Sequence, residues 1–508
     1  MVYKIGDKMD FTQAVNKTMA EYNRFTLTEN SGKQLATTDS PLLDLFATIG
    51  AMRHKTEEQI KLDFSKAYAD NPLLATRMAF YARDIRHGGL GERRTFRTIL
   101  NWMGRYDLGT MLANIDLIPY FGRFDDLFAL IGTQAENSMW EYISHTLKSD
   151  MENSMLGLPT TQLAKWMPSI NTSSKTTRAL AKICAKRLSF SEKEYRLLLS
   201  KLRSHIDIVE RKMTYNRWDE INYPAVPSQA MRIYRNAFFR HSPEKYAKYM
   251  TQVETGTAKI NAKTLYPYDI LRQYGLRYGL GYGYCRDGSF FVGNFDATLE
   301  EQWKALPNYI SGENNVLVMS DTSGSMSGLP ISISISLAIY FAERNSGAYK
   351  DLFLTFSGNP KFIKLVGTNL KEKVECIDVI IDNTDIEKAF DLILETAIEN
   401  RVSQSEMPKA LIVITDMEFD ESTNGDISYR LAKKKFDDVG YTLPAVIFWN
   451  VSQRTSGFQV KANADNVILV SGSSAGTFKN ILNNIGTTPY EYMVNILNSE
   501  PYNQINLG

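Results

Sequence analysis

The sequence predicts a multidomain protein in which an α-helical repeat domain is followed by a doubly wound, Rossmann-like α/β domain. Across residues 40–250, apolar side chains recur at spacings of three and four, which is typical of amphipathic helices. From residue 313, short apolar strands alternate with such helices. The length of 508 residues and the 44% hydrophobic content also indicate more than one core.

The helical domain is predicted over residues 41–250, after an N-terminal arm at residues 1–40. Its segments include "SPLLDLFATIGAM", "PLLATRMAFYARDI" and "SEKEYRLLLSKLRSHIDIVERKM". Three helix starts place a capping residue before proline, at Ser40, Asn71 and Ser242. We expect roughly eight to ten helices, arranged either as a HEAT-like α-solenoid or as a compact bundle.

Residues 251–312 are predicted to be a connector because they are rich in tyrosine and glycine and lack a clear period. Gly279 and Gly281 follow no predicted strand, and the third glycine of a dinucleotide-binding fingerprint is absent. A nicotinamide or flavin dinucleotide site is therefore not expected here.

The α/β domain is predicted over residues 313–508. Its strands are "NVLVMSD", "DLFLTFSG", "FIKLVG", "KALIVITDM", "LPAVIFWNV" and "NVILVSG", and helices are expected over 331–345, 386–399, about 427–438 and about 476–499. Ligands of such domains bind at the carboxyl ends of the strands. Asp321 and Asp416 both fall at predicted strand ends.

Oxygen-bearing side chains gather at these strand ends. Asp321, Ser323 and Ser325 alternate along a tight glycine-containing loop, while Thr384 and Asp416 come from later loops. Hydroxyl and carboxylate oxygens suit Mg²⁺ or another divalent cation. We expect these five residues to bind the ion, directly or through water, and to leave one position open for a carboxylate from a partner protein.

Enzymatic alternatives fit this loop poorly. A serine hydrolase elbow would need serine where Met326 stands, a P-loop would need lysine at Leu329, and a phosphotransferase would need an acid at Ser323. A metal-dependent hydrolase is the weakest alternative, because only Asp385 or Glu418 could be nominated as a general base. The protein is predicted not to be an enzyme.

The net charge of +1 conceals an asymmetry. Residues 1–300 hold 41 Lys and Arg against 32 Asp and Glu, whereas residues 301–508 hold 17 against 25. The excess is greatest in residues 151–250, with 18 basic and 8 acidic residues. This favours an anionic partner on the helical half, with a solvated basic face as the alternative.

Two resemblances extend this interpretation. "DTSGSM", the threonine of "NTD" and "ITDMEFD" resemble the metal-ion-dependent adhesion site of von Willebrand factor type A domains. "SPLLDLFATIGAMR", "YARDIRHGGLGERRTF" and "GRFDDLFAL" resemble the TROVE module of the Ro autoantigen family, and most closely the Ro-like proteins. The resemblance implies a helical ring closed by the type A domain, and a scaffold that binds single-stranded RNA ends and small structured RNAs without catalysis.

Two basic segments are the candidates for RNA contact. One surrounds the glycines of "RDIRHGGLGERRTFR", and the other recurs at helical spacing in "SKTTRALAKICAKR". Their alternative roles are helix capping and local ion pairing, for example with Asp84 or Glu92. The candidate residues are Arg83, Arg86, Arg93 and Arg94, with Arg97 beside them, and Lys175, Arg178, Lys182, Lys186 and Arg187.

The sequence also gives an expectation for location. It contains no window of eighteen apolar residues, and "MVYKIGDKMD" lacks the apolar region of an export signal. Three cysteines without a CxxC spacing predict neither a disulfide framework nor a zinc cluster. We expect a cytoplasmic protein with no membrane partner.

Overall fold

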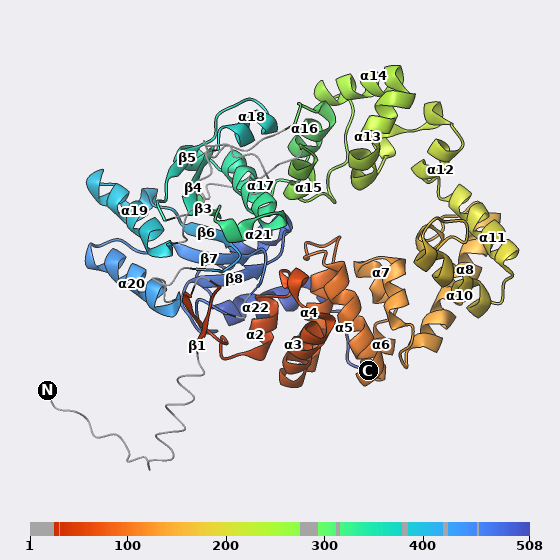
Figure 1. Cartoon of the computed structure of the whole chain (residues 1–508), viewed down its shortest axis with the longest axis horizontal. Helices are drawn as coiled ribbons and strands as arrows, with labels where there is room; N and C mark the ends of the chain where they lie inside the picture. The colour runs from red at the N-terminus through yellow and green to blue at the C-terminus, as the bar shows by residue number, and fades with distance from the viewer. Residues whose placement is uncertain are drawn as a thin grey trace, which may run out of the picture.

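The computed structural model describes residues 25–29, 31–274, 293–310, 315–356, 358–377, 385–419, 425–454 and 457–508. Figure 1 shows a curved row of helices whose two ends both reach an α/β unit, so that the molecule has a ring-like outline. The predicted order of a helical half followed by an α/β half is confirmed.

The described part of the predicted N-terminal arm forms a hairpin. Strands β1 (Phe25–Leu27) and β2 (Lys33–Leu35) pair antiparallel. Leu35 also bridges to Phe458, with backbone N–H···O distances of 3.0 and 2.9 Å. The hairpin is therefore attached to the α/β unit, more than 400 positions later in the chain.

The helical row contains more helices than expected, because short helices separate the long ones. Five of them, α2, α6, α7, α9 and α12, have only four to six residues. The helices of the row are α2 (Pro41–Phe46), α3 (Glu57–Asp70), α4 (Pro72–Arg83), α5 (Arg93–Tyr106), α6 (Leu108–Ala113), α7 (Leu117–Phe121), α8 (Glu136–Met155), α9 (Leu163–Trp166), α10 (Lys175–Arg187), α11 (Glu192–His205), α12 (Val209–Thr214), α13 (Ser228–His241) and α14 (Pro243–Glu254).

Two of the three predicted caps form. The side chains of Ser40 and Asn71 accept the backbone N–H three residues later, at 3.3 and 3.0 Å. Ser242 precedes α14 as expected but makes no side-chain cap. Its hydroxyl donates instead to the Asp219 carboxylate at 3.3 Å, which ties the start of α14 to the 3₁₀ turn Trp218–Glu220 that lies before α13.

The predicted connector at 251–312 is partly helical. It contains the end of α14, α15 (Pro267–Leu271) and α16 (Ala297–Lys304). Helices α15 and α16 pack against α17 (Leu329–Arg344), where the ring centroids of Trp303 and Tyr340 lie 6.4 Å apart. The Tyr340 hydroxyl also donates to the Pro307 carbonyl at 2.5 Å. The described part of this segment thus joins one end of the helical row to the α/β unit.

The sheet has the order β5-β4-β3-β6-β7-β8, in which only the edge strand β5 is antiparallel. Figure 1 shows α17 on one face and α19 and α20 on the other. The strands are β3 (Val316–Asp321), β4 (Leu352–Phe356), β5 (Phe362–Lys364), β6 (Ala410–Thr415), β7 (Ala445–Asn450) and β8 (Val467–Ser471). The remaining helices are α18 (Leu370–Glu375), which the sequence analysis missed, α19 (Ile386–Glu399), α20 (Gly425–Asp438), α21 (Phe478–Leu482) and α22 (Pro489–Leu497).

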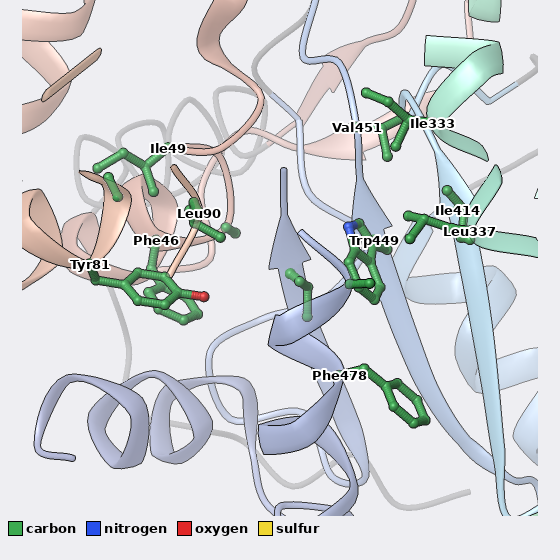
Figure 2. Packing of buried hydrophobic residues seen from close by; sticks show 14 of the residues in the cluster. Phe46, Ile49, Tyr81, Leu90, Ile333, Leu337, Ile414, Trp449, Val451 and Phe478 are labelled. Carbon is green, nitrogen blue, oxygen red and sulfur yellow. The ribbon is translucent and has the colours of Figure 1, made fainter. Parts of the chain in front are cut away.

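The other end of the helical row packs against the end of the α/β unit. Figure 2 shows Phe46 and Tyr81 of the row in one apolar cluster with Trp449 of the sheet. Gly50 fits here because a Cβ at this position would lie 2.7 Å from the backbone of Gly472. Helix α22 contacts α2 and α4, which closes the ring-like outline.

The apolar interior is divided unevenly. One continuous core runs through α2–α11, α15–α16 and the α/β unit. A separate core of ten buried residues, including Tyr223, Phe238 and Tyr246, belongs to α13, α14 and the loop before them. Within the ranges that the structure describes, no helix is both long and apolar enough to cross a membrane.

Candidate functional site

The candidate metal centre lies at the point where the strand order of the sheet reverses, between β3 and β6. The chain leaves β3 toward β4 on one side, and β6 lies on the other side of β3. Because β3 and β6 run parallel, their carboxyl ends meet at one edge, which is where ligands of open α/β sheets bind. Asp321 ends β3 and Asp416 follows β6, so both carboxylates reach this edge.

Asp321 is fully buried and held by two donors. Its Oδ1 accepts the Ser323 N–H at 2.9 Å, and its Oδ2 accepts the Thr415 hydroxyl at 2.6 Å. These bonds fix the carboxylate at the junction of the two strands. The first one also bends the following loop back over the strand end.

That loop presents the two predicted serines together. Ser323 is 4% exposed, Ser325 lies in the 3₁₀ turn Gly324–Met326, and their hydroxyl oxygens are 3.0 Å apart. Either hydroxyl can rotate its proton away and offer lone pairs to a cation. The alternating spacing in the sequence therefore brings both oxygens to one side of the loop.

Asp416 is buried without a full set of donors. Its Oδ1 accepts the Glu418 N–H at 3.3 Å, but its Oδ2 finds no donor of suitable geometry in the described ranges. Burial, and then the charge of Asp321, raise the pKa of Asp416 to about 7, although the nearby Ser325 hydroxyl opposes this shift. A nearby positive charge would therefore stabilise the ionised form of Asp416 at neutral pH.

These observations fit a hard divalent cation. Four of the five predicted ligands, Asp321, Ser323, Ser325 and Asp416, lie on adjoining loops, and the unsatisfied Oδ2 supplies the oxygen with most need of a cation. The predicted fifth ligand, Thr384, lies outside the described residues. The donor set is all oxygen, which favours Mg²⁺ over the softer transition metals.

The two nominated general bases have structural roles. Asp385 caps α19 by accepting the N–H groups of Glu387 and Lys388 at 3.1 and 3.2 Å. Glu418 is 1% exposed and accepts the Glu29 N–H at 2.7 Å. Both carboxylates are oriented by backbone donors, which gives no support to the hydrolase alternative.

The first basic segment is largely used inside the fold. Arg83 is 3% exposed, and its Nε donates to the fully buried Asp126 at 2.7 Å. Arg97 pairs with the other oxygen of Asp126 at 2.6 Å. Arg83 was a predicted RNA contact, and its burial leaves it inaccessible to a polymer at the surface.

The remaining arginines of this segment are exposed. Arg86 donates to the Gly122 carbonyl at 2.9 Å and Arg94 to the Lys55 carbonyl at 2.7 Å. Partial burial, and then the positive charges of Arg97 and Arg123, lower the pKa of Arg93. Asp125 and Asp126 oppose this shift, so Arg93 lies beside charges of both signs.

The second basic segment forms an exposed stripe. On α10, successive residues turn by about 100°, which places Lys175, Arg178, Lys182 and Lys186 within one side of the helix. Lys182 pairs with Glu192 at 3.2 Å. Arg187 points elsewhere and pairs with Glu136 at 2.6 Å. The stripe therefore keeps several charges available to solvent.

Sequence reasoning missed two residues at the candidate metal centre. Arg454 donates to the Ser325 carbonyl at 2.5 Å and pairs with Glu29 at 3.3 Å. The position of Arg454 shortly after β7 was a usable signal, because this loop also leaves the carboxyl edge of the sheet. Nothing in the sequence points to Glu29, which arrives from the N-terminal hairpin.

Comparisons with known proteins place the chain in a family. "Domain of unknown function (DUF2828)" matches residues 28–154 and 142–313, and "Domain of unknown function (DUF7788)" matches residues 315–501. An uncharacterized protein of Acanthamoeba polyphaga mimivirus is 26% identical over 523 residues, which cover 94% of this chain and 87% of the viral protein. Because the first family covers more than half of the 508 residues, this chain belongs to the DUF2828 family.

Proposed function

We propose that this protein is a non-enzymatic, cytoplasmic scaffold that binds RNA on its helical half and a divalent cation on its α/β half. The resemblance to Ro-like proteins motivates the RNA part, and the type A resemblance motivates the metal part. The observation that carries the proposal is the buried Asp416 Oδ2, which lacks a donor in the described ranges and lies near a second carboxylate.

The metal site would be built from Asp321, Ser323, Ser325, Asp416 and, from outside the described residues, Thr384. When bound, Mg²⁺ or another divalent cation supplies an electrophilic position that can take a carboxylate of a partner protein. Asp321 orients the loop through the Ser323 N–H, and Thr415 keeps Asp321 in place. The protein's own residues thus hold the oxygens together, and neutral serines limit the negative charge around the ion.

Metal binding is tested by thermal unfolding with Mg²⁺ or with EDTA. A ligand that binds only the folded state stabilises it by RT ln(1 + [L]/Kd), so Mg²⁺ at about 100 times its Kd adds about 2.7 kcal/mol. We expect a Mg²⁺-dependent rise in Tm for the wild type and none for Asp416→Asn.

The matched control is Asp391→Asn, because this carboxylate lies on the surface of α19 and pairs with Lys435 at 2.7 Å. The Asp391→Asn variant should keep the full Mg²⁺ response. An equal response in wild type and Asp416→Asn would contradict the metal site.

RNA binding is supported by the exposed stripe on α10 and by Arg93. Lysine and arginine side chains on one side of a helix neutralise phosphates without reading the base sequence. The basic excess in residues 151–250 adds a long-range attraction. The burial of Arg83 removes one predicted contact, so the α10 stripe carries most of this proposal.

Copurification tests the RNA part. The protein is expressed, divided between RNase-treated and untreated samples, and washed over a series of salt concentrations. We expect bound RNA that is released as salt rises. Protein that is free of nucleic acid at low salt would instead favour the alternative, a metal-dependent protein-interaction adaptor. The internal ion pairs of Arg83 and Arg97 support this alternative, because they take two basic side chains away from RNA.

A further inference from the structure

Arg454 joins the candidate metal centre to the N-terminal hairpin. Its Nη2 donates to the Ser325 carbonyl at 2.5 Å, and the Ser325 hydroxyl lies 3.0 Å from that of Ser323. Its Nη1 lies 3.3 Å from the Glu29 carboxylate. One guanidinium therefore contacts the ligand-bearing loop and an acid from the other end of the chain.

The backbone around Glu29 is held firmly. The Glu29 N–H donates to the Glu418 carboxylate at 2.7 Å, and the Thr28 hydroxyl donates to the Phe419 carbonyl at 2.6 Å. Gln34 also donates to the Met417 carbonyl. The hairpin is thus fixed to the loop that follows β6, the strand that delivers Asp416.

The side chain of Glu29, in contrast, can be replaced at Arg454 by another carboxylate. The side chains of Arg454 and Glu29 are 30% and 54% exposed. Ion pairs with this exposure contribute about 0–1 kcal/mol, because water and salt screen them. Another carboxylate can therefore replace Glu29 at little cost.

We propose that Arg454 is an anion-binding residue at the rim of the metal centre, and that Glu29 takes the place of the partner's carboxylate when no partner is bound. This inference rests on the proposed metal function. The planar guanidinium can grip a carboxylate with two parallel N–H groups, while the ion takes an oxygen of the same acidic segment. At Arg454 itself, the exchange of one carboxylate for another breaks and forms only charge-assisted hydrogen bonds.

The charge of this half favours an acidic protein segment over a nucleic acid. Residues 301–508 hold 25 acidic and 17 basic residues, so a long polyanion is repelled. A short segment that presents one or two carboxylates meets Arg454 and the ion without covering the acidic surface. In this proposal the α10 stripe binds RNA, whereas Arg454 binds a carboxylate of a protein partner.

The test measures binding of an immobilised glycine–serine peptide that carries two adjacent glutamates, in Mg²⁺ and in EDTA, by a surface biosensor. Loss of the competing acid in Glu29→Gln should strengthen Mg²⁺-dependent binding about threefold, and Arg454→Gln should weaken it by at least as much. The opposite signs matter, because a purely structural ion pair would move both variants in the same direction.

A neighbouring ion pair provides the matched control. Lys461 and Asp39 are 3.0 Å apart and 29% and 50% exposed, and they too link the N-terminal arm to the α/β unit. Asp39→Asn and Lys461→Gln should bind the peptide like the wild type. This pair has the same arrangement of charges as Arg454 and Glu29, but within the described ranges it contacts no ligand-bearing loop.

The outcomes separate this inference from the proposed function. If Mg²⁺ raises the Tm of the wild type but Glu29→Gln binds the peptide no better, the role of Arg454 and Glu29 is refuted and the metal site stands. If Mg²⁺ changes neither Tm nor peptide binding, the metal function itself fails. Equal weakening in Glu29→Gln and Arg454→Gln would also overturn the exchange.

Discussion

Two buried carboxylates in this protein have opposite surroundings. Asp126, in the helical row, receives Arg83 at 2.7 Å and Arg97 at 2.6 Å. Asp416, in the α/β unit, lies near Asp321, and none of the described lysines or arginines pairs with it. The first carboxylate is fully compensated, whereas the second keeps its proton up to about neutral pH.

This difference in pairing distinguishes a buried carboxylate that stabilises the fold from one that can bind a ligand. A compensated buried charge loses its hydration but regains hydrogen bonds, so it can serve packing alone. An uncompensated one raises the free energy of the metal-free fold and is retained where a ligand supplies the missing charge. The pairing of buried charges therefore locates the candidate site better than the number of charges does.

The largest expected effect is the loss of compensation at Asp126. Arg83→Met leaves this carboxylate buried with one arginine fewer, and we expect the free energy of unfolding to fall by about 3–5 kcal/mol. Denaturant unfolding monitored by circular dichroism measures it. Arg105→Met is the control, because Arg105 is exposed on α5 and its side chain bonds only to Asn101, at 3.0 Å, within the described ranges. Similar losses of unfolding free energy in both variants would contradict the claim that Asp126 depends on Arg83.

At Asp416 we expect the opposite result, namely that removing the charge stabilises the metal-free protein. The pKa of Asp416 is about 7 in the folded state and about 3.9 in the unfolded state, so between these values only the folded state holds the proton. The stability of the metal-free protein should therefore fall as pH rises from about 4 to 7.

Asp416→Asn should remove this pH dependence and raise metal-free stability at pH 8 by on the order of 2 kcal/mol. Thermal unfolding in EDTA at pH 5 and pH 8 measures both effects. A variant less stable than the wild type at pH 8 would show that Asp416 is compensated after all.

The α10 stripe represents a third kind of charge, which is neither buried nor needed for folding. Replacing Lys175, Arg178 and Lys186 with glutamine should weaken binding of single-stranded RNA about tenfold. The negative slope of log binding constant against log salt concentration should become shallower by about two. Fluorescence anisotropy over a salt series measures this change. Lys433→Gln with Lys434→Gln on α20 is the control, since both lysines are exposed. An unchanged slope would remove α10 from the RNA surface.

The smallest expected effect is at Arg93. It lies in the same segment as Arg83 but is exposed, so Arg93→Gln should change unfolding free energy by less than about 0.5 kcal/mol. Removing one phosphate contact should weaken RNA binding about two- to fourfold. A large destabilisation with no change in RNA binding would place Arg93 with Arg83 among the structural arginines.

The sequence predicted the α/β half well because its signals are local. The predicted helix at 386–399 coincides with α19, and Asp321 ends β3 as expected. The helical half was less predictable, since whether an arginine is buried depends on acids far along the chain. Asp126 lies 43 positions after Arg83, and no local pattern links them.

The candidate metal centre was also predictable only as far as local sequence patterns reach. The alternation of Asp321, Ser323 and Ser325 indicates a cluster of oxygens, and the strand ends bring Asp416 to them. Glu29 could not be found in this way, because the hairpin reaches the site only through tertiary contacts such as its N–H bond to Glu418.

The closure of the ring also sets an order of events during synthesis. The Tyr502 hydroxyl donates to the buried Asp84 at 3.0 Å, across 418 positions, and Asn506 bonds to Asn114 across 392. The first helices leave the ribosome long before these partners exist. At a synthesis rate of about 5–20 residues per second, they wait on the order of half a minute with one apolar side uncovered. We therefore expect chaperones to bind the nascent chain until α22 has been made.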